Sequence, residues 1–306
     1  MDMEIFADRL VAAVRKKSSP CVVGLDPRID LMPRFVKSGR GAHSRATVCS
    51  IISDFHEVVL DAVADLIPAV KPQLAFYEQY GIGGLEGFEN TVNAARERGL
   101  LVINDGKRND VSSTAEAYAN AFLSNTAFYS DCLTVTPYLG RDSLEPFVKA
   151  CGHHGKGLFV VLKTSNPGSC DFQDQPLEDT GHPLYESIAG IIEEIGKELI
   201  GQSGYSSIGA VIGATFPEDA RRLRALMPHA LILVPGYGVQ GGNAENAAAC
   251  FNENGLGAVV SSSRGITYAH SDGDISRSAF AQVVRDKTRR MVDEIIKATS
   301  VPTPAR

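Results

Sequence analysis

Residues 99–111 read GLLVINDGKRNDV, an apolar run that passes directly into a cluster of charged side chains. The apolar part, 99–103, predicts a buried strand, and the pattern over 112–123 predicts a helix after it. A buried strand, a charged turn and a helix form the repeating unit of an α/β protein. This stretch therefore indicates both the fold class and the place where charged groups gather.

The charged cluster contains Asp105, Lys107 and Asp110. Side chains at positions i and i+2 of a strand point to the same face, so we expect Asp105 and Lys107 to meet where the strand ends. A lysine held between two carboxylates stays protonated, because nearby negative charge favours its charged form. Such a lysine is a fixed cation and a proton donor, whereas a Schiff-base nucleophile needs a neutral amine. A lone motif of this kind is usually a surface ion pair, so the rest of the chain must decide.

The same unit recurs along the 306 residues, after a leading helix expected over 3–17. Strands are expected at 21–25, 69–72, 99–103, 132–136, 157–162, 208–213, 231–234 and 257–260. Helices are expected at 48–66, 88–98, 112–123, 144–151, 185–200, 217–226, 243–252 and 278–298. Eight such pairs predict a (β/α)8 TIM barrel. We expect one barrel domain over 1–306, with loop insertions near 33–46 and 166–205, because no composition shift marks a second domain.

Composition limits the classes of partner and compartment. The chain is 44% hydrophobic and has a formal net charge of -6, so neither nucleic acid nor an anionic membrane is expected as a partner. The six cysteines are scattered without a C-x-x-C pair, and no metal-ligand spacing is visible. Neither a secretory signal nor a membrane-spanning run is apparent, so a cytoplasmic location is expected.

Polar residues recur just after the predicted strands. In a (β/α)8 barrel these positions meet at the face that carries the active site. The residues that we expect to converge there are Asp26, Lys71, Asp105, Lys107, Asp110, Thr136, Lys163, Thr164, Ser165, Thr215, Gln240 and Arg264. Each one alone would be a turn residue or a helix cap, but together they predict a charged central site.

The last two strands are followed by glycine-rich and serine-rich loops. Residues 235–242 read PGYGVQGG, and residues 261–266 read SSSRGI. Glycines let a backbone approach a ligand closely, and free N–H groups together with an arginine suit a phosphate dianion. The loops after strands seven and eight are the usual phosphate site in barrels. We therefore expect a phosphorylated ligand at Arg264.

With these motifs in order, the chain resembles the orotidine 5′-phosphate decarboxylase family, in its longer bacterial-type branch. The resemblance covers nearly the whole chain. The matching segments are GLDP at 24–27, KPQ at 71–73, DGKRND at 105–110, TVTPY at 134–138, KTSNPG at 163–168, PGYGVQGG at 235–242 and RGI at 264–266.

The resemblance implies decarboxylation of orotidine 5′-monophosphate to uridine 5′-monophosphate without a metal or organic cofactor. It implies that Lys107 protonates C6 and that Lys71, Asp105, Lys107 and Asp110 form a charged array. In the family the last aspartate comes from the neighbouring subunit, so Asp110 implies a homodimer with shared active sites.

The resemblance also implies a set of binding residues. They are Asp26 and Lys71 for the ribose hydroxyls, Thr114 from the partner subunit, Thr164 or Ser165 for the pyrimidine, and Gln240, Gly241 and Arg264 for the phosphate. The sequence leaves the choice between Thr164 and Ser165 open.

Three other functions compete with this one. A metal-dependent keto-sugar-phosphate decarboxylase or synthase shares the D-x-K-x-x-D pattern, but such enzymes commonly carry a further acidic residue after strand two, where this chain has Lys71-Pro72-Gln73. A non-catalytic nucleotide sensor would bind the nucleotide without turnover. A Schiff-base aldolase would be trapped by borohydride on a lysine.

Overall fold

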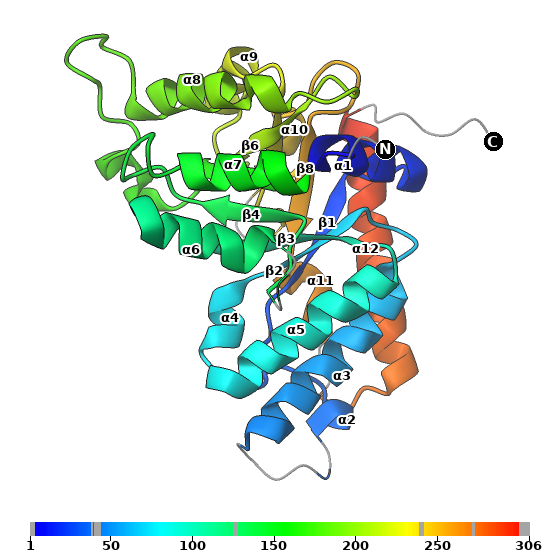
Figure 1. Ribbon diagram of the computed structural model, residues 1–306. Helices are drawn as coiled ribbons and strands as arrows, with labels where there is room; N and C mark the ends of the chain where they lie inside the picture. Colours follow the sequence, from blue (N-terminus) through cyan, green and yellow to red (C-terminus); the bar gives the residue numbers. More distant parts are fainter. Residues whose placement is uncertain are drawn as a thin grey trace.

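The computed structural model describes residues 4–37, 39, 44–124, 126, 128–238, 242–270 and 273–299. Eight parallel strands pair in sequence order, and β8 pairs with β1 to close a barrel (Figure 1). The strands are β1 Cys21–Leu25, β2 Ala69–Pro72, β3 Leu101–Arg108, β4 Cys132–Val135, β5 Gly157–Lys163, β6 Ser206–Ile212, β7 Ala230–Val234 and β8 Ala258–Ser262. The predicted (β/α)8 barrel is confirmed.

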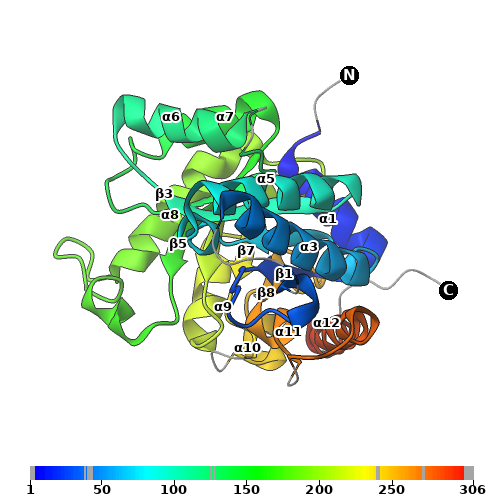
Figure 2. The same cartoon turned by 90° about the horizontal axis from the view of Figure 1, so that it is seen from below.

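Helices surround the barrel, and Figure 2 shows them from below. The α-helices are α1 Phe6–Lys17, α2 Arg34–Lys37, α3 Arg45–Val63, α4 Leu74–Glu78, α5 Gly81–Glu97, α6 Ser112–Leu123, α7 Glu145–His154, α8 Leu184–Gly196, α9 Pro217–Leu226, α10 Ala244–Ala248, α11 Arg264–Thr267 and α12 Arg277–Thr299. Two 3-10 helices, η1 Pro167–Asp171 and η2 Lys197–Leu199, flank α8. Helices α3 and α5 lie side by side in both views, and α12 packs against α3.

Away from their carboxyl ends, the strands are largely apolar on both faces because both faces are covered. Every residue of β1, β6, β7 and β8 is buried. One face of each strand meets the barrel interior and the other meets the helical layer, so polar alternation has no place in them. Burial on both faces explains why the strands were visible in the sequence as unbroken apolar runs.

Helix α1 packs against the N-terminal end of the barrel. The ring of Phe6 lies 6.1 Å from that of Phe159, and a Cβ at Gly157, the first residue of β5, would come within 2.1 Å of the Phe6 ring. The Arg9 guanidinium pairs with Asp131 at 2.6 Å, just ahead of β4. These contacts lie at the end of the barrel where the strands begin, opposite the loops that follow them.

The structure differs from the sequence expectations mainly in its shortest elements. Helices α2, α4 and α11 were not expected, and β3 continues to Arg108, beyond the predicted end at 103. The segment between β5 and α8 projects from the barrel (Figures 1 and 2). Within the described ranges, none of the helices has the length and apolar character needed to cross a membrane.

Candidate active site

The charged cluster lies at an irregular end of β3. The register against β4 shifts between Asn104 and Arg108, and Lys107 has a left-handed backbone with φ of 44°. The Lys107 N–H donates to Thr134 Oγ1 at 2.9 Å, and its Nζ donates to Asp105 Oδ1 at 2.6 Å. The expected meeting of Asp105 and Lys107 is thus confirmed, although a bulge brings the two side chains together rather than regular strand alternation.

The backbone conformation of Lys107 carries a cost. A non-glycine residue in the left-handed region is strained by about 1–3 kcal/mol and persists only where its surroundings hold it. The contacts of Lys107 to Thr134 and Asp105 supply that constraint. Such strain clusters at functional sites, where it fixes the direction of a side chain.

Asp105 is the centre of the cluster, and four donors converge on its buried carboxylate. They are Lys71 Nζ at 2.8 Å, Gln73 Nε2 at 3.0 Å, Lys107 Nζ at 2.6 Å and Thr134 Oγ1 at 2.9 Å. Burial would raise the pKa of Asp105, but the Lys71 and Lys107 ammonium groups outweigh it and lower the pKa below its ordinary value. Asp105 is therefore ionised at neutral pH.

Lys71 is the buried cation of the cluster, with 5% of the residue exposed. Burial would lower the pKa of its ammonium, but the charges of Asp105 and Asp26 and the hydrogen bond to Asp105 raise it above its ordinary value. Lys71 thus remains charged. Lys107 differs, because 45% of its side chain is exposed.

A cavity of about 450 Å³ opens over these groups. Its wall combines five of the predicted site residues, namely Asp26, Lys71, Asp105, Lys107 and Arg264. Other lining residues were not singled out from the sequence as site residues: Arg28, Gln73, Phe76, Tyr237 and Tyr268. The sequence carried a signal for Gln73, which lies within the KPQ segment, but none for Tyr268, which reaches the site from the end of α11.

The β1 end of the cavity is held by Tyr268. Its hydroxyl accepts from the Arg28 N–H at 2.8 Å and donates to the Asp26 carbonyl at 3.0 Å. The Asp26 carboxylate oxygen Oδ1 is buried and has no hydrogen-bond partner among the described residues. Asp26 thus offers the cavity an acceptor that a ligand hydroxyl could satisfy.

Residues of both predicted phosphate loops also line the cavity. Arg264 begins α11, and the Ser262 hydroxyl donates to the Tyr237 carbonyl at 3.2 Å, which ties the β8 loop to the β7 loop. A Cβ at Gly24 would lie 1.8 Å from Ser263 Oγ, so β1 and the β8 loop are in close contact. The other two predicted phosphate residues, Gln240 and Gly241, fall outside the described residues.

Seven described residues that were expected at the site do not line this cavity: Asp110, Thr114, Thr136, Lys163, Thr164, Ser165 and Thr215. Asp110 accepts a hydrogen bond from the Val111 N–H, and no contact with Lys107 is present in the described part of one chain. Thr114 is exposed in the first turn of α6. Thr164 and Ser165 follow β5. Within one chain, Lys107 therefore meets one of its two expected carboxylates, Asp105.

The described residues contain no group of three or more His, Cys, Asp and Glu side chains arranged to hold a metal ion. At the end of β2, where the metal-dependent alternative would commonly place an acidic residue, the structure has the Lys71 ammonium bonded to Asp105.

Comparison with known proteins agrees with this geometry. A family model described as the orotidine 5′-phosphate decarboxylase / HUMPS family matches residues 22–278. The chain belongs to this family. The orotidine 5′-phosphate decarboxylase of Rhodopirellula baltica is 43% identical to it, over 96% of this chain and 99% of the relative. That of Caldicellulosiruptor saccharolyticus is 40% identical, over 90% of this chain and 94% of the relative.

A solved structure gives the same answer. The structure of Leishmania donovani OMP decarboxylase has a TM-score of 0.75 and 27% identity, and the match covers 97% of this chain and 100% of that one. The resemblance to the orotidine 5′-phosphate decarboxylase family is therefore confirmed at the level of sequence and fold.

Proposed function

We propose that this protein is a carboxy-lyase that converts orotidine 5′-monophosphate to uridine 5′-monophosphate and CO2 in de novo pyrimidine biosynthesis. The observation that carries the proposal is the Lys71–Asp105–Lys107 array, which shares one cavity with Arg264. The chain is also 43% identical, over almost its full length, to an orotidine 5′-phosphate decarboxylase. Six free cysteines fit a reducing cytosol as its place of action.

The proposed reaction breaks the bond between C6 and the carboxylate, which leaves as CO2. The electron pair remains on C6 in the ring plane, where the π system delocalises it poorly. Stabilisation must therefore be electrostatic, and a preorganised ammonium in a site that closes against water provides it. Lys107 is placed for this role because its ammonium is held by Asp105 while part of the side chain faces the cavity.

Lys107 then gives a proton to C6 and recovers one from solvent. Because the same residue supplies the positive charge and the proton, the proposed chemistry needs no metal or organic cofactor. Asp105 would lie beside the substrate carboxylate and repel it, a repulsion that eases as CO2 leaves. We treat this ground-state effect as secondary, because Lys71 and Lys107 already neutralise much of the Asp105 charge.

The remaining cavity groups suit the rest of the nucleotide. Asp26 and Lys71 would hold ribose hydroxyls, and the unpartnered Oδ1 of Asp26 supports this role. Arg264, with Gln240 and Gly241, would hold the phosphate, because a guanidinium forms charge-assisted bonds with it. Phosphate binding energy gained far from C6 can assist closure of the site.

Ser165 is our candidate for the pyrimidine contact, and Thr164 is the residue that the following segment holds in place. The Thr164 hydroxyl donates to Asn166 Oδ1 at 2.7 Å and accepts from Gln173 Nε2 at 2.9 Å. Ser165 is the next residue and packs against Gly213, which follows β6. A Cβ added at Gly213 would lie 3.0 Å from the Cβ of Ser165.

We further propose a homodimer in which Asp110 and Thr114 serve the site of the second copy. Neither residue lines the cavity of its own chain, which supports this arrangement. An exposed apolar side chain next to Asp110 also favours a covered surface, because Val111 is 48% exposed.

The test is a direct assay of the purified protein with orotidine 5′-monophosphate, following loss of its ultraviolet absorbance with and without a chelator. We expect turnover that the chelator does not change. Turnover that stops on chelation would favour the metal-dependent alternative. Nucleotide binding without turnover would favour a sensor, and borohydride trapping of a lysine would favour an aldolase.

A further inference from the structure

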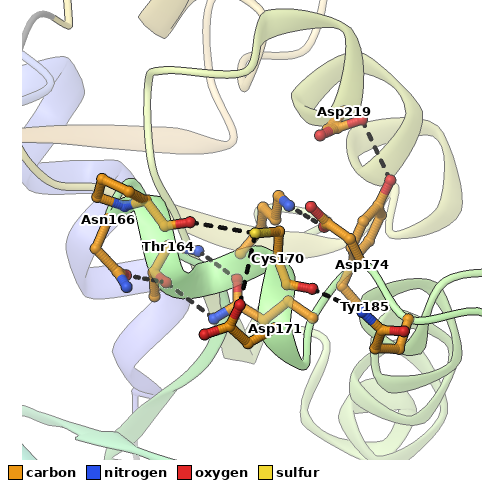
Figure 3. A network of polar contacts seen from close by, with 11 residues as sticks. Thr164, Asn166, Cys170, Asp171, Asp174, Tyr185 and Asp219 are labelled. Atoms are coloured by element: carbon orange, nitrogen blue, oxygen red, sulfur yellow. Dashed lines mark hydrogen bonds and ion pairs between the residues drawn. The ribbon is translucent and has the colours of Figure 1, made fainter.

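The segment between β5 and α8 turns back onto the end of β5 through two neighbouring residues, Gln173 and Asp174. Gln173 Oε1 accepts from the Thr164 N–H at 2.9 Å, and Gln173 Nε2 donates to the Thr164 hydroxyl at 2.9 Å. One side chain thus holds both the backbone and the side chain of Thr164. Figure 3 shows this network around Thr164 and Asn166.

Asp174 makes the second attachment, to Lys163, the last residue of β5. The Lys163 side chain is 1% exposed, and its ammonium lies 5.0 Å from the centre of the Tyr185 ring and 4.9 Å from that of Phe216. A buried ammonium is costly unless a carboxylate is paired with it. Asp174 supplies that carboxylate from the projecting segment.

The two attachments hold Lys163 and Thr164, the two residues that precede Ser165. Across β6, Gly213 leaves no room beside Ser165, because an added Cβ would lie 3.0 Å from both the Cβ and the N of Ser165. The backbone of Ser165 is therefore limited on one side by Gly213 and is anchored through Thr164 and Lys163 on the other. A displacement of about 1 Å in a group that orients the substrate can lower the reaction rate about a hundredfold.

We propose that Gln173 and Asp174 are positioning residues that set Ser165 for recognition of the pyrimidine. This inference rests on the proposed function and assigns a specific task to the projecting segment. Neither Gln173 nor Asp174 lines the cavity that holds Asp26, Lys71 and Arg264, so replacing them leaves the groups assigned to ribose and phosphate in place. Loss of the contacts that Gln173 and Asp174 make with Thr164 and Lys163 should therefore weaken recognition of the base and leave ribose and phosphate binding intact.

The experiment compares two ligands by calorimetry. Uridine 5′-monophosphate carries the base, whereas ribose 5-phosphate keeps only the groups assigned to Asp26, Lys71 and Arg264. The test variants are Gln173→Leu, which removes both bonds to Thr164, and Asp174→Asn, which removes the charge that pairs with Lys163.

The chain offers matched controls within the same segment. Gln175→Leu removes a side-chain bond to the Cys170 carbonyl, which stays inside the segment. Asp171→Asn changes the net charge as Asp174→Asn does, and Asp171 is exposed in η1. Unfolding temperatures of all four variants report whether each protein remains folded.

We expect Gln173→Leu to weaken uridine 5′-monophosphate about tenfold and ribose 5-phosphate less than about twofold, with both controls at wild-type affinity. Asp174→Asn should also weaken the affinity for uridine 5′-monophosphate. If Asp174→Asn does not fold, the result for Gln173→Leu alone decides the question. Three results would each overturn the proposed role of Gln173 and Asp174. They are an unchanged nucleotide affinity in Gln173→Leu, equal losses for both ligands, and an equal loss in Gln175→Leu. A wild type that binds neither ligand and does not turn over the substrate would overturn the proposed function itself.

Discussion

Lys107 combines a left-handed backbone with an ammonium fixed against a buried carboxylate. The backbone strain and the contact have the same effect, because both restrict the direction in which Nζ can point. Asp105 in turn is held by four donors, so it cannot rotate away. At the scale of single residues, the site is therefore organised before a ligand arrives, which is the requirement for electrostatic catalysis.

Replacing Lys107 by alanine should lower kcat by at least about a thousandfold, since both the positive charge and the proton donor are lost. Lys107→Arg serves as the matched variant. It keeps a positive charge, but a guanidinium does not release its proton at neutral pH. We expect both variants to be nearly inactive, with wild-type circular dichroism. Substantial turnover by Lys107→Ala in a clean preparation would remove Lys107 from the role of proton donor.

Arg264→Ala should weaken the phosphorylated substrate and spare the bare nucleoside. A hydrogen bond to a charged group contributes about 1.5–3 kcal/mol, which corresponds to a tenfold to hundredfold change in affinity. The exposure of Arg264 in the free protein favours the lower end of this range. The measurement is the inhibition constant of orotidine against that of its 5′-phosphate. Equal losses for the two compounds would show that Arg264 does not contact the phosphate.

At the scale of elements, helices α3 and α5 are joined by a buried histidine. His56 Nδ1 lies 3.0 Å from Thr91 Oγ1, and the Thr91 hydroxyl donates to the Gly87 carbonyl. The Tyr77 hydroxyl lies 3.3 Å from the same ring nitrogen, so Nδ1 is surrounded by two hydroxyl groups. The other ring nitrogen, Nε2, is buried without a hydrogen-bond partner among the described residues. Burial lowers the pKa of His56 to about 3, so the folded protein keeps the ring neutral.

This burial makes the helix pair sensitive to acid. The unfolded chain protonates His56 below its ordinary pKa of about 6.5, whereas the folded protein does so only near 3. The unfolded state therefore binds more protons between these values, and stability falls as pH drops through this window. Between pH 7.5 and pH 5 we expect a loss of about 2 kcal/mol from this residue.

Chemical denaturation at the two pH values measures the loss. His56→Gln should reduce the difference between them by about the same amount, because glutamine does not titrate. His153→Gln is the control, since His153 is exposed at the end of α7. An unchanged pH dependence in His56→Gln would contradict the assignment.

The helices and strands also show how much of the fold could be predicted from the sequence. The long apolar runs and the patterned helices were predictable, and α6 and α9 have the predicted bounds. One-turn helices such as α4 and α11 were not, because so few residues carry no periodic pattern and their shape depends on tertiary contacts. In the site, the motif located Asp105 and Lys107 but could not reveal the left-handed backbone of Lys107 or the reach of Gln173 back to Thr164.

At the scale of the whole molecule, the proposed homodimer would bring Asp110 of one copy to the active site of the other. Asp105 and Lys107 lie in the cavity, but Asp110 does not join them there. In the proposed homodimer, a second copy that covers the exposed surface at Val111 would supply the Asp110 carboxylate. A dimer with two-fold symmetry would complete both sites at once, since each chain both gives and receives the same residue.

Mixing two inactive variants tests this arrangement. Asp110→Ala and Lys107→Ala should each be inactive alone, and a heterodimer of the two would carry one site with both defects and one with neither. Random exchange makes about half of the dimers mixed, so about a quarter of wild-type activity should return. Mass-tagged subunits verify the exchange. If exchange is complete and activity stays at background, Asp110 acts within its own chain and the shared site is wrong.

The close contact between Gly24 in β1 and Ser263 after β8 has a consequence for recombination. These residues lie near opposite ends of the gene product, yet a single methyl group at Gly24 would collide with the Ser263 side chain. In a library of chimaeras with related barrels, the pair must be inherited from one parent or from parents that share it. A crossover anywhere between the two positions separates them, so Gly24 and Ser263 have to be exchanged together although they lie far apart in the sequence.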